Sequence, residues 1–139
     1  MAQYIRDLMT PNPVTLSATS TLVDAAMAMR DFDVGAVIVL DDGQIYGIAT
    51  DRDIVVRAIA NGNYPATTKL GEVCSRELAT VTPSDTVDVA VRLMRDRAIR
   101  RLPVVENGQP VGIVSIGDLS TEREPDSPLA DISNAPPNR

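Results

Sequence analysis

The sequence predicts an α+β protein in which two β-α-β-β-α repeats pack as a pseudo-twofold pair. The chain aligns with itself at an offset of 65 residues without a gap, so that residues 4–54 pair with residues 69–119. The same order of helical and strand-like apolar patterns appears in both copies. Each copy holds only about three short strands, too few to bury an apolar face alone, so the two copies must pack together.

The similarity of the two copies extends to individual residues. Twelve of the 51 aligned positions are identical, and many others exchange one apolar residue for another. The identical pairs include Thr15/Thr80, Thr21/Thr86, Ala25/Ala90, Met29/Met94, Val39/Val104, Gly43/Gly108, Gly47/Gly112 and Asp53/Asp118.

Each copy opens with a short strand followed by a helix. Residues 14–16 and 79–81 are the predicted strands, and each leads into a polar stretch of the kind that begins a helix. Apolar residues then recur at i, i+3, i+4 and i+7, which predicts one buried helical face per copy. These faces are Leu22, Ala25, Ala26 and Met29 in the first copy and Val87, Ala90, Val91 and Met94 in the second.

A hairpin and a second helix follow. Asp42-Gly43 and Asn107-Gly108 each separate two apolar runs, which is a strong hairpin signal because both turn positions need positive φ. In the first copy, residues 51–62 have helical spacing and end in Asn-Gly, a typical helix stop. In the second copy Pro125 limits the corresponding helix to about two turns.

These signals predict the following organisation. Residues 1–60 form the first repeat, 61–69 have the composition of a linker, and 70–122 form the second repeat. The proline-rich residues 123–139 are predicted to be a loose tail.

Composition excludes several classes of function. A net charge of -6 without a long run of Lys or Arg argues against nucleic acid as a partner. No apolar run approaches the length of a membrane span, and the start of the chain lacks the apolar core of a signal peptide. Cys74 is the only cysteine and there is no histidine, so the usual zinc and copper ligand sets are missing. We expect a cytoplasmic protein without a required metal, in which Cys74 is a small buried hydrophobe.

One short motif recurs at the end of each hairpin. Thr50-x-x-Asp53 in the first copy matches Ser115-x-x-Asp118 in the second. Such a pair is an ordinary helix cap, in which the two side chains satisfy backbone N–H groups. A helix start can also offer N–H groups to a phosphate, and a carboxylate can accept hydrogen bonds from two vicinal hydroxyls. Both interpretations are open, and Gly47 and Gly112 would allow a ligand to come close to the backbone.

The repeats resemble the CBS domain, named after cystathionine β-synthase. The resemblance rests on "DLMTPNPVTL", "TDRDIVVRAIANG", "RRLPVVENGQPVGIVS" and the recurring Gly-apolar-x-Ser/Thr-x-x-Asp, and it covers residues 1 to about 122. It implies two repeats that face each other across a pseudo-dyad, with two clefts between them, and further association of two such pairs. In many members the clefts take AMP, ADP, ATP or S-adenosylmethionine.

The resemblance assigns roles to the motif residues. Thr50 and Ser115 would contact the phosphate or ribose of a ligand, and Asp53 and Asp118 would accept hydrogen bonds from the ribose hydroxyls. Three arginines near the motifs are candidates for the phosphate chain, since Arg grips phosphate through paired N–H groups; their alternative role is a solvated charge or a dimer contact. These are Arg52, Arg100 and Arg101. The adenine slot could be lined by Val14, Ala36, Val37, Val81 and Leu102, which could equally be plain core.

The leading functional hypothesis is a homodimeric sensor of adenosine-containing ligands that acts in trans on an unidentified protein partner. The alternative is a CBS-fold interaction or scaffold protein with empty or vestigial ligand sites, which the shortened last helix and the unequal motifs favour. Catalysis is the weakest hypothesis, because no Ser or Cys has an identifiable base. Asp51 and Asp53 could at most hold Mg²⁺ together with a nucleotide.

Overall fold

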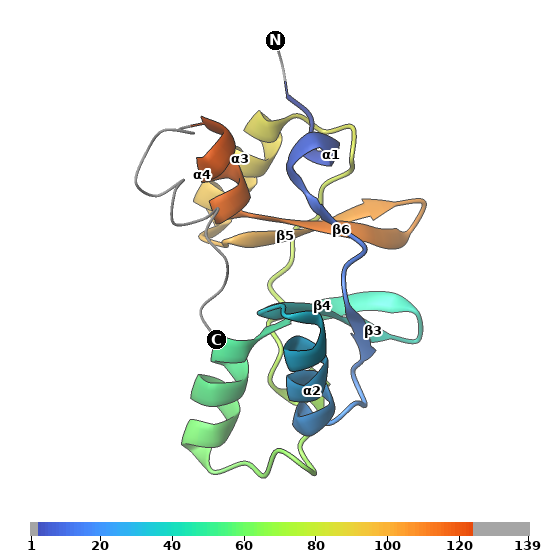
Figure 1. Cartoon of the computed structure of the whole chain (residues 1–139), viewed down its shortest axis with the longest axis vertical. Helices are drawn as coiled ribbons and strands as arrows, with labels where there is room; N and C mark the ends of the chain where they lie inside the picture. The colour runs from blue at the N-terminus through green and yellow to red at the C-terminus, as the bar shows by residue number, and fades with distance from the viewer. Residues whose placement is uncertain (1–2, 124–139) are drawn as a thin grey trace. The chain divides into compact units, whose positions relative to one another are not determined.

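The computed structural model describes residues 3–123, which form two compact units (Figure 1). We call residues 13–78 the TDRD unit, after its motif at 50–53. We call residues 3–12 together with 79–123 the SIGD unit, after its motif at 115–118. Both units combine a three-stranded sheet with helices, which confirms the predicted α+β class.

The TDRD unit holds a sheet in the order β2-β3-β4. Strand β2 pairs in parallel with β3, and β3 pairs antiparallel with β4. A π-helical segment, η1, and a 3-10 turn, η2, follow β4 and end at Gly62 with positive φ, as the Asn-Gly stop predicts. The elements are β2 (Thr15–Ser17), α2 (Leu22–Phe32), β3 (Ala36–Asp41), β4 (Gln44–Thr50), η1 (Asp53–Ala58), η2 (Ile59–Asn61) and η3 (Leu70–Glu72).

The SIGD unit has a sheet in the order β1-β6-β5, and its helices α1, α3 and α4 lie on one side of that sheet (Figure 1). Helix α4 has 8 residues, which confirms the expected two turns. The predicted strand at 79–81 is reduced to one residue, because only Val81 bridges to Val104 of β5. The elements are α1 (Ile5–Leu8), β1 (Thr10–Pro11), α3 (Val87–Arg97), β5 (Arg101–Glu106), β6 (Gln109–Ser115) and α4 (Ile116–Arg123).

Both predicted hairpins are present. The turn residues Asp42 and Gly43 have φ of 53° and 77°, and Asn107 and Gly108 have φ of 53° and 76°. Positive φ at both central positions is what a two-residue turn needs to follow the twist of its strands. The two hairpins also share an irregularity in register, between Val39 and Leu40 and between Val104 and Val105.

The opening segment of each sequence repeat packs in the unit that holds the other repeat's sheet. Strand β1 pairs with β6, and Ile5 of α1 is fully buried in the SIGD core. In the TDRD unit, Leu70 is fully buried and Ser75 bridges to Ile48 of β4. The compact units therefore differ from the sequence repeats by an exchange of opening segments.

This exchange explains the two glycines before the motifs. A Cβ on Gly47 would collide with the carbonyl oxygen of Ser75, and one on Gly112 would lie 2.7 Å from Met9 Sδ and 2.9 Å from Thr10 O. The expectation that these glycines make room for a ligand is wrong, since the backbone of the exchanged segment already occupies the space.

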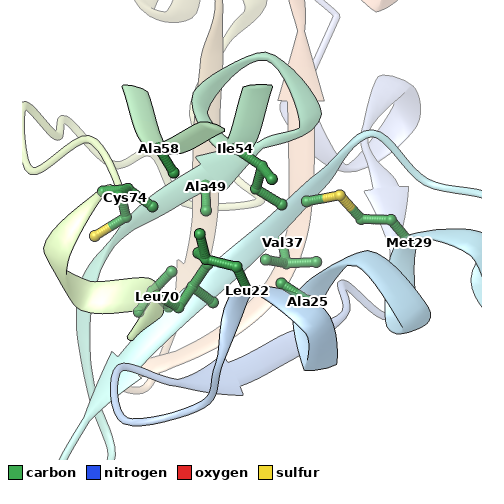
Figure 2. Close-up of a cluster of buried hydrophobic side chains, with 11 residues drawn as sticks. Leu22, Ala25, Met29, Val37, Ala49, Ile54, Ala58, Leu70 and Cys74 are labelled. Carbon is green, nitrogen blue, oxygen red and sulfur yellow. The ribbon is translucent and has the colours of Figure 1, made fainter. Parts of the chain in front are cut away.

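The buried faces of α2 and α3 follow the predicted periodicity with one correction. Leu22, Ala25 and Met29 are buried, but Ala26 is exposed. Figure 2 shows these three side chains packed with Val37, Ala49, Ile54, Ala58, Leu70 and Cys74 in the TDRD core.

The segment predicted as a linker makes ordered contacts within the TDRD unit. The N–H groups of Leu22 and Val23 donate to the carbonyls of Thr68 and Pro65, at 3.0 and 3.2 Å. The N–H of Leu70 donates to Ser20 O at 2.7 Å. These bonds satisfy backbone groups at the start of α2, so the segment forms part of the unit. The predicted tail, 123–139, lies outside the described residues from 124 onward.

Candidate ligand-binding site

Thr50 and Asp53 form a reciprocal pair of hydrogen bonds where β4 ends. The Thr50 N–H donates to Asp53 Oδ2 at 2.9 Å, and the Asp53 N–H donates to Thr50 Oγ1 at 3.1 Å. Ser115 and Asp118 repeat this arrangement at the end of β6, with distances of 2.8 and 3.2 Å. Both motifs are therefore capping boxes, each satisfying two backbone N–H groups at a helix start.

Capping geometry alone does not distinguish these motifs from other helix starts. Thr21 and Asp24 make the same reciprocal pair, at 3.1 Å in both directions, where α2 begins. What sets Thr50–Asp53 and Ser115–Asp118 apart is their position, since each follows the last strand of its sheet and all four residues are half-buried. Thr21 is also half-buried, whereas Asp24 is exposed.

The carboxylates retain capacity to bind further donors. The cap hydrogen bonds engage Oδ2 of Asp53 and Oδ2 of Asp118. A carboxylate offers about four lone-pair directions on its two oxygens, so Oδ1 of each can accept from a ligand without breaking the cap. The cap interpretation and the ligand interpretation are thus compatible.

The strand register brings some of the predicted secondary residues to the motifs. Ala36 pairs with Thr50 in the TDRD unit, and Arg101 pairs with Ser115 in the SIGD unit. The backbone makes a second equivalent link, because Asp51 N–H donates to Gly35 O and Ile116 N–H donates to Arg100 O. The SIGD motif consequently has two arginines on the adjoining strand end.

The same positions in the TDRD unit hold small residues. The Asp51 carboxylate lies over Gly35, with Oδ2 3.5 Å from where a Cβ on that glycine would stand. Arg52 is exposed, as are Arg100 and Arg101. The TDRD motif therefore has one acid and one arginine next to it, where the SIGD motif has two arginines.

The candidate adenine-slot residues separate into two groups. Val14 and Ala36 are half-buried and stand on or beside the sheet, with Val14 O accepting the Ile38 N–H. Val37 and Leu102 are fully buried and Val81 is 2% exposed, so these three are core residues in their own units.

A cationic neighbourhood near the TDRD motif was not predicted. The Arg57 side chain donates to Val73 O at 3.3 Å. The Arg76 guanidinium lies over the Tyr46 ring, 3.7 Å from its centroid, and its Nε donates to Tyr46 O at 3.4 Å. Arg76 belongs to the exchanged segment, and no local pattern in the sequence signals that it packs beside β4.

Cys74 is buried in the TDRD core, as expected. Burial raises the pKa of its thiol, with Arg76 opposing and Asp53 adding to the shift. A thiol with a raised pKa is a poor nucleophile at neutral pH, which agrees with a packing role.

Within residues 3–119, no three His, Cys, Asp or Glu side chains are grouped so that they could hold a metal ion. None of the helices in the described part of the chain has the length and apolar character needed to cross a bilayer.

Comparison with known proteins gives a consistent result. The family model for the CBS domain matches the chain twice, at residues 5–59 and 70–124. The CBS domain-containing protein YhcV of Bacillus subtilis is 39% identical over 119 residues, which are 86% of this chain and 84% of that protein. Hypoxic response protein 1 of Mycobacterium tuberculosis is 33% identical over 116 residues, 83% of this chain and 81% of that one.

Solved structures show the same fold. The crystal structure of hypoxic response protein I with two coordinated zinc ions has a TM-score of 0.74 at 30% identity, covering 86% of this chain and 98% of that one. The zinc ions belong to that structure, and this chain has no histidine and a single cysteine. The CBS domain pair of protein MJ0100, in complex with 5'-methylthioadenosine and S-adenosyl-L-methionine, has a TM-score of 0.79 over 91% of this chain at 23% identity, which shows a shared fold.

Proposed function

This chain belongs to the CBS domain family, and we propose that it is a regulatory module that binds an adenosine-containing ligand through its two Ser/Thr-x-x-Asp motifs. The observation that carries the proposal is the recurrence of one arrangement in both units. In each, a half-buried hydroxyl and a half-buried carboxylate stand where the last strand passes into a helix, with Oδ1 of the carboxylate able to accept.

The chemistry of the motifs suits a ribose with a charged substituent. Vicinal ribose hydroxyls are donors, and Asp53 Oδ1 or Asp118 Oδ1 is the matching acceptor. AMP, ADP, ATP and S-adenosylmethionine share this ribose. The complex of MJ0100 with S-adenosyl-L-methionine supports this ligand class, as an example from a protein of the same fold.

The two motifs are proposed to differ in their preference for phosphate. Arg100 and Arg101 adjoin the SIGD motif, whereas Gly35 and Ala36 occupy those positions in the TDRD unit. Guanidinium groups bind phosphate oxygens through paired N–H donors, so an adenine nucleotide should prefer the SIGD motif. Isothermal titration that shows two equal and independent sites for ATP would contradict this difference.

The regulatory part of the proposal is action in trans on a protein partner. A ligand shifts a conformational equilibrium only by the difference in its affinity for the two states, so the sensor needs a bound state that its partner recognises. The module acts here by binding, without a catalytic step.

Thermal unfolding with AMP, ATP and S-adenosylmethionine tests the proposal. A ligand at 100 times its Kd adds about 2.7 kcal/mol to the free energy of unfolding, which is a rise in Tm of several degrees. The double variant Asp53→Ala/Asp118→Ala should lose this rise. Asp24→Ala is the matched control, because it removes the same type of cap and should keep the full ligand-dependent rise.

A scaffold with vestigial sites is the second candidate, favoured by the unequal motifs TDRD and SIGD. It predicts no change in Tm with any of these ligands in the unmodified protein. A rise of the same size in Asp53→Ala/Asp118→Ala as in the unmodified protein would place the ligand elsewhere and refute the proposed role of the motifs.

A further inference from the structure

Five exposed arginines gather around the C-terminal end of α3 in the SIGD unit. Two lie in the last turn of the helix, one lies a turn earlier, and two stand where the chain enters β5. Residues 92–101 contain these five arginines and one acid, Asp96, so their local net charge is +4 in a chain whose net charge is -6. We call these five side chains the arginine cluster: Arg92, Arg95, Arg97, Arg100 and Arg101.

The members of the cluster are close enough to bind one extended peptide together. Arg92 and Arg97 are five residues apart on the helix, which is about 7.5 Å along its axis. The chain from Arg97 to Arg100 spans at most about 11 Å. Within residues 3–119, the one ion pair that involves the cluster joins Arg95 to Asp96 at 3.5 Å, with both side chains well exposed. The cluster therefore offers several guanidinium groups to a partner.

The TDRD unit does not share the cluster. At the offset of 65 residues, the corresponding residues are Met27, Arg30, Phe32, Gly35 and Ala36. Arg30 pairs with Asp31 at 2.9 Å, as Arg95 does with Asp96, so both units have this ion pair near the end of the helix. The helix dipole favours a cation there, which accounts for the shared arginine. It does not account for the other four, because the equivalent helix of the TDRD unit ends without them.

We propose that the arginine cluster is a docking surface for an acidic segment of a partner protein. Guanidinium groups bind carboxylates through paired N–H donors, so the Asp and Glu side chains of an extended peptide are the matching groups. A nucleic acid fits less well, because a long polyanion extends beyond the cluster and meets a chain of net negative charge. Arg100 and Arg101 also adjoin the SIGD motif, so a partner bound to the cluster lies next to the proposed ligand site. The inference rests on the proposed function in one respect, that a protein partner exists.

Fluorescence anisotropy of the full chain with a labelled acidic peptide tests the proposal without any nucleotide. A peptide of about 12 residues, in which Glu alternates with Ser, should bind with a Kd of about 100 μM or below in about 50 mM NaCl. The affinity should fall at least about 10-fold in about 300 mM NaCl, because salt screens exposed charges. A single-stranded DNA oligonucleotide of the same charge should bind more weakly than the peptide.

Charge reversal in the helical part of the cluster should weaken peptide binding. Arg92→Glu/Arg97→Glu leaves the Arg95–Asp96 pair in place and should raise the Kd at least about 10-fold. Arg92→Gln/Arg97→Gln removes the two charges without adding repulsion and should raise it about 3-fold or more. Circular dichroism and Tm report whether each variant keeps its fold, which is expected because both arginines are exposed.

Arg30→Glu/Lys69→Glu is the matched control, because it changes the net charge equally at two exposed positions of the TDRD unit. It should change the Kd by less than about 2-fold. The proposal is overturned if the Kd of the unmodified chain exceeds about 100 μM in about 50 mM NaCl, or if the control variant weakens binding as much as Arg92→Glu/Arg97→Glu does. Folded cluster variants that bind the peptide as tightly as the unmodified chain, or DNA that binds as tightly as the peptide, would also overturn it.

The acids of residues 124–139 are the competing occupant within this chain. The variant Glu124→Gln/Asp126→Asn/Asp131→Asn neutralises them and should change the Kd of the peptide by less than about 2-fold. If it tightens peptide binding at least about 10-fold, those acids occupy the cluster and the proposal of a partner segment is wrong. Since no nucleotide is present, these results are independent of whether the motifs bind adenosine ligands.

Discussion

The TDRD and SIGD units are two versions of one fold that have kept their interiors and changed their surfaces. Their hairpins and the capping boxes that follow them match residue for residue, down to the register irregularity in each hairpin, although the third strand of each sheet differs. Their exposed helix positions differ in chemical character, since Val23 and Met27 of the first repeat correspond in the sequence to Asp88 and Arg92 of the second. The shared positions are those that packing and backbone hydrogen bonds constrain. The exposed helix positions carry no such constraint, so they can differ between the two units.

The two units also differ in net charge. The described TDRD unit carries nine acidic and five basic side chains, a net charge of -4, while residues 3–12 and 79–123 carry seven of each. The SIGD unit gathers five of its arginines within residues 92–101. One unit is thus apolar and acidic on its surface, and the other is neutral overall with a basic segment beside its motif.

The largest difference in stability between the two units is expected for substitutions of Gly47 and Gly112, the glycines that the exchanged segments pack against. Gly47→Ala should cost about 3 kcal/mol of unfolding free energy, because the new Cβ meets the Ser75 backbone carbonyl, which cannot move without disturbing β4. Gly112→Ala should cost less, about 2 kcal/mol, since the Met9 side chain can rotate away and the backbone contact that remains, with Thr10 O at 2.9 Å, is longer than the one at Gly47. Urea denaturation measures both.

Gly35→Ala is the control for this pair, because its Cβ would meet only Asp51 at an ordinary contact distance of 3.5 Å. It should change stability by less than about 1 kcal/mol. If Gly47→Ala and Gly112→Ala lower the free energy of unfolding equally, the two exchanged segments are packed equally closely against their sheets and the expected difference is wrong.

The next effect compares how much the two exchanged segments contribute to the free energy of unfolding. Ile5 and Leu70 are equivalent in the repeat, and each is a fully buried side chain from the exchanged segment. Ile5→Ala and Leu70→Ala should each cost about 2–5 kcal/mol, the usual range for a cavity in a packed core. Lys69→Ala, next to Leu70 and exposed, should stay within about 0.5 kcal/mol. An Ile5→Ala variant as stable as Lys69→Ala would mean that the opening segment does not dock on the SIGD core.

Much of this architecture could be predicted from the sequence because its signals are local. Asp42-Gly43 and Asn107-Gly108 specify their turns through backbone preferences, and the apolar spacing of 22–29 specifies a buried face whatever else the chain does. The Thr50–Asp53 and Ser115–Asp118 hydrogen bonds are also local, since three residues separate the partners.

The features that sequence did not reveal depend on contacts between distant segments. Arg76 stacks on Tyr46 from 30 positions away, and β1 pairs with β6 from about a hundred positions away. The recurrence of Gly47 and Gly112 is visible in the sequence, but the backbone that fills the space beside each glycine comes from a distant segment. Ala26 fits the helical period yet is exposed, so the buried face of α2 is narrower than the pattern allows.

The smallest expected difference lies at Cys74, whose equivalent in the other unit is Met9. Burial raises the pKa of the Cys74 thiol above its unfolded value, so above about pH 8.5 the unfolded chain releases this proton before the folded chain does. The unfolded state then binds fewer protons, and the free energy of unfolding must fall as pH rises through that window. Below it, both states hold the proton and the group contributes no pH dependence.

Cys74→Met, which copies the SIGD residue, should remove this component of the alkaline loss of stability. Urea denaturation at pH 7.5, 8.5 and 9.5 measures the slope, and thiol titration with a disulfide reagent gives an independent check, because a buried protonated thiol should react far more slowly in the native protein than in urea. Identical slopes in both proteins, together with rapid native labelling, would show that Cys74 is accessible and that the two units do not differ at this position.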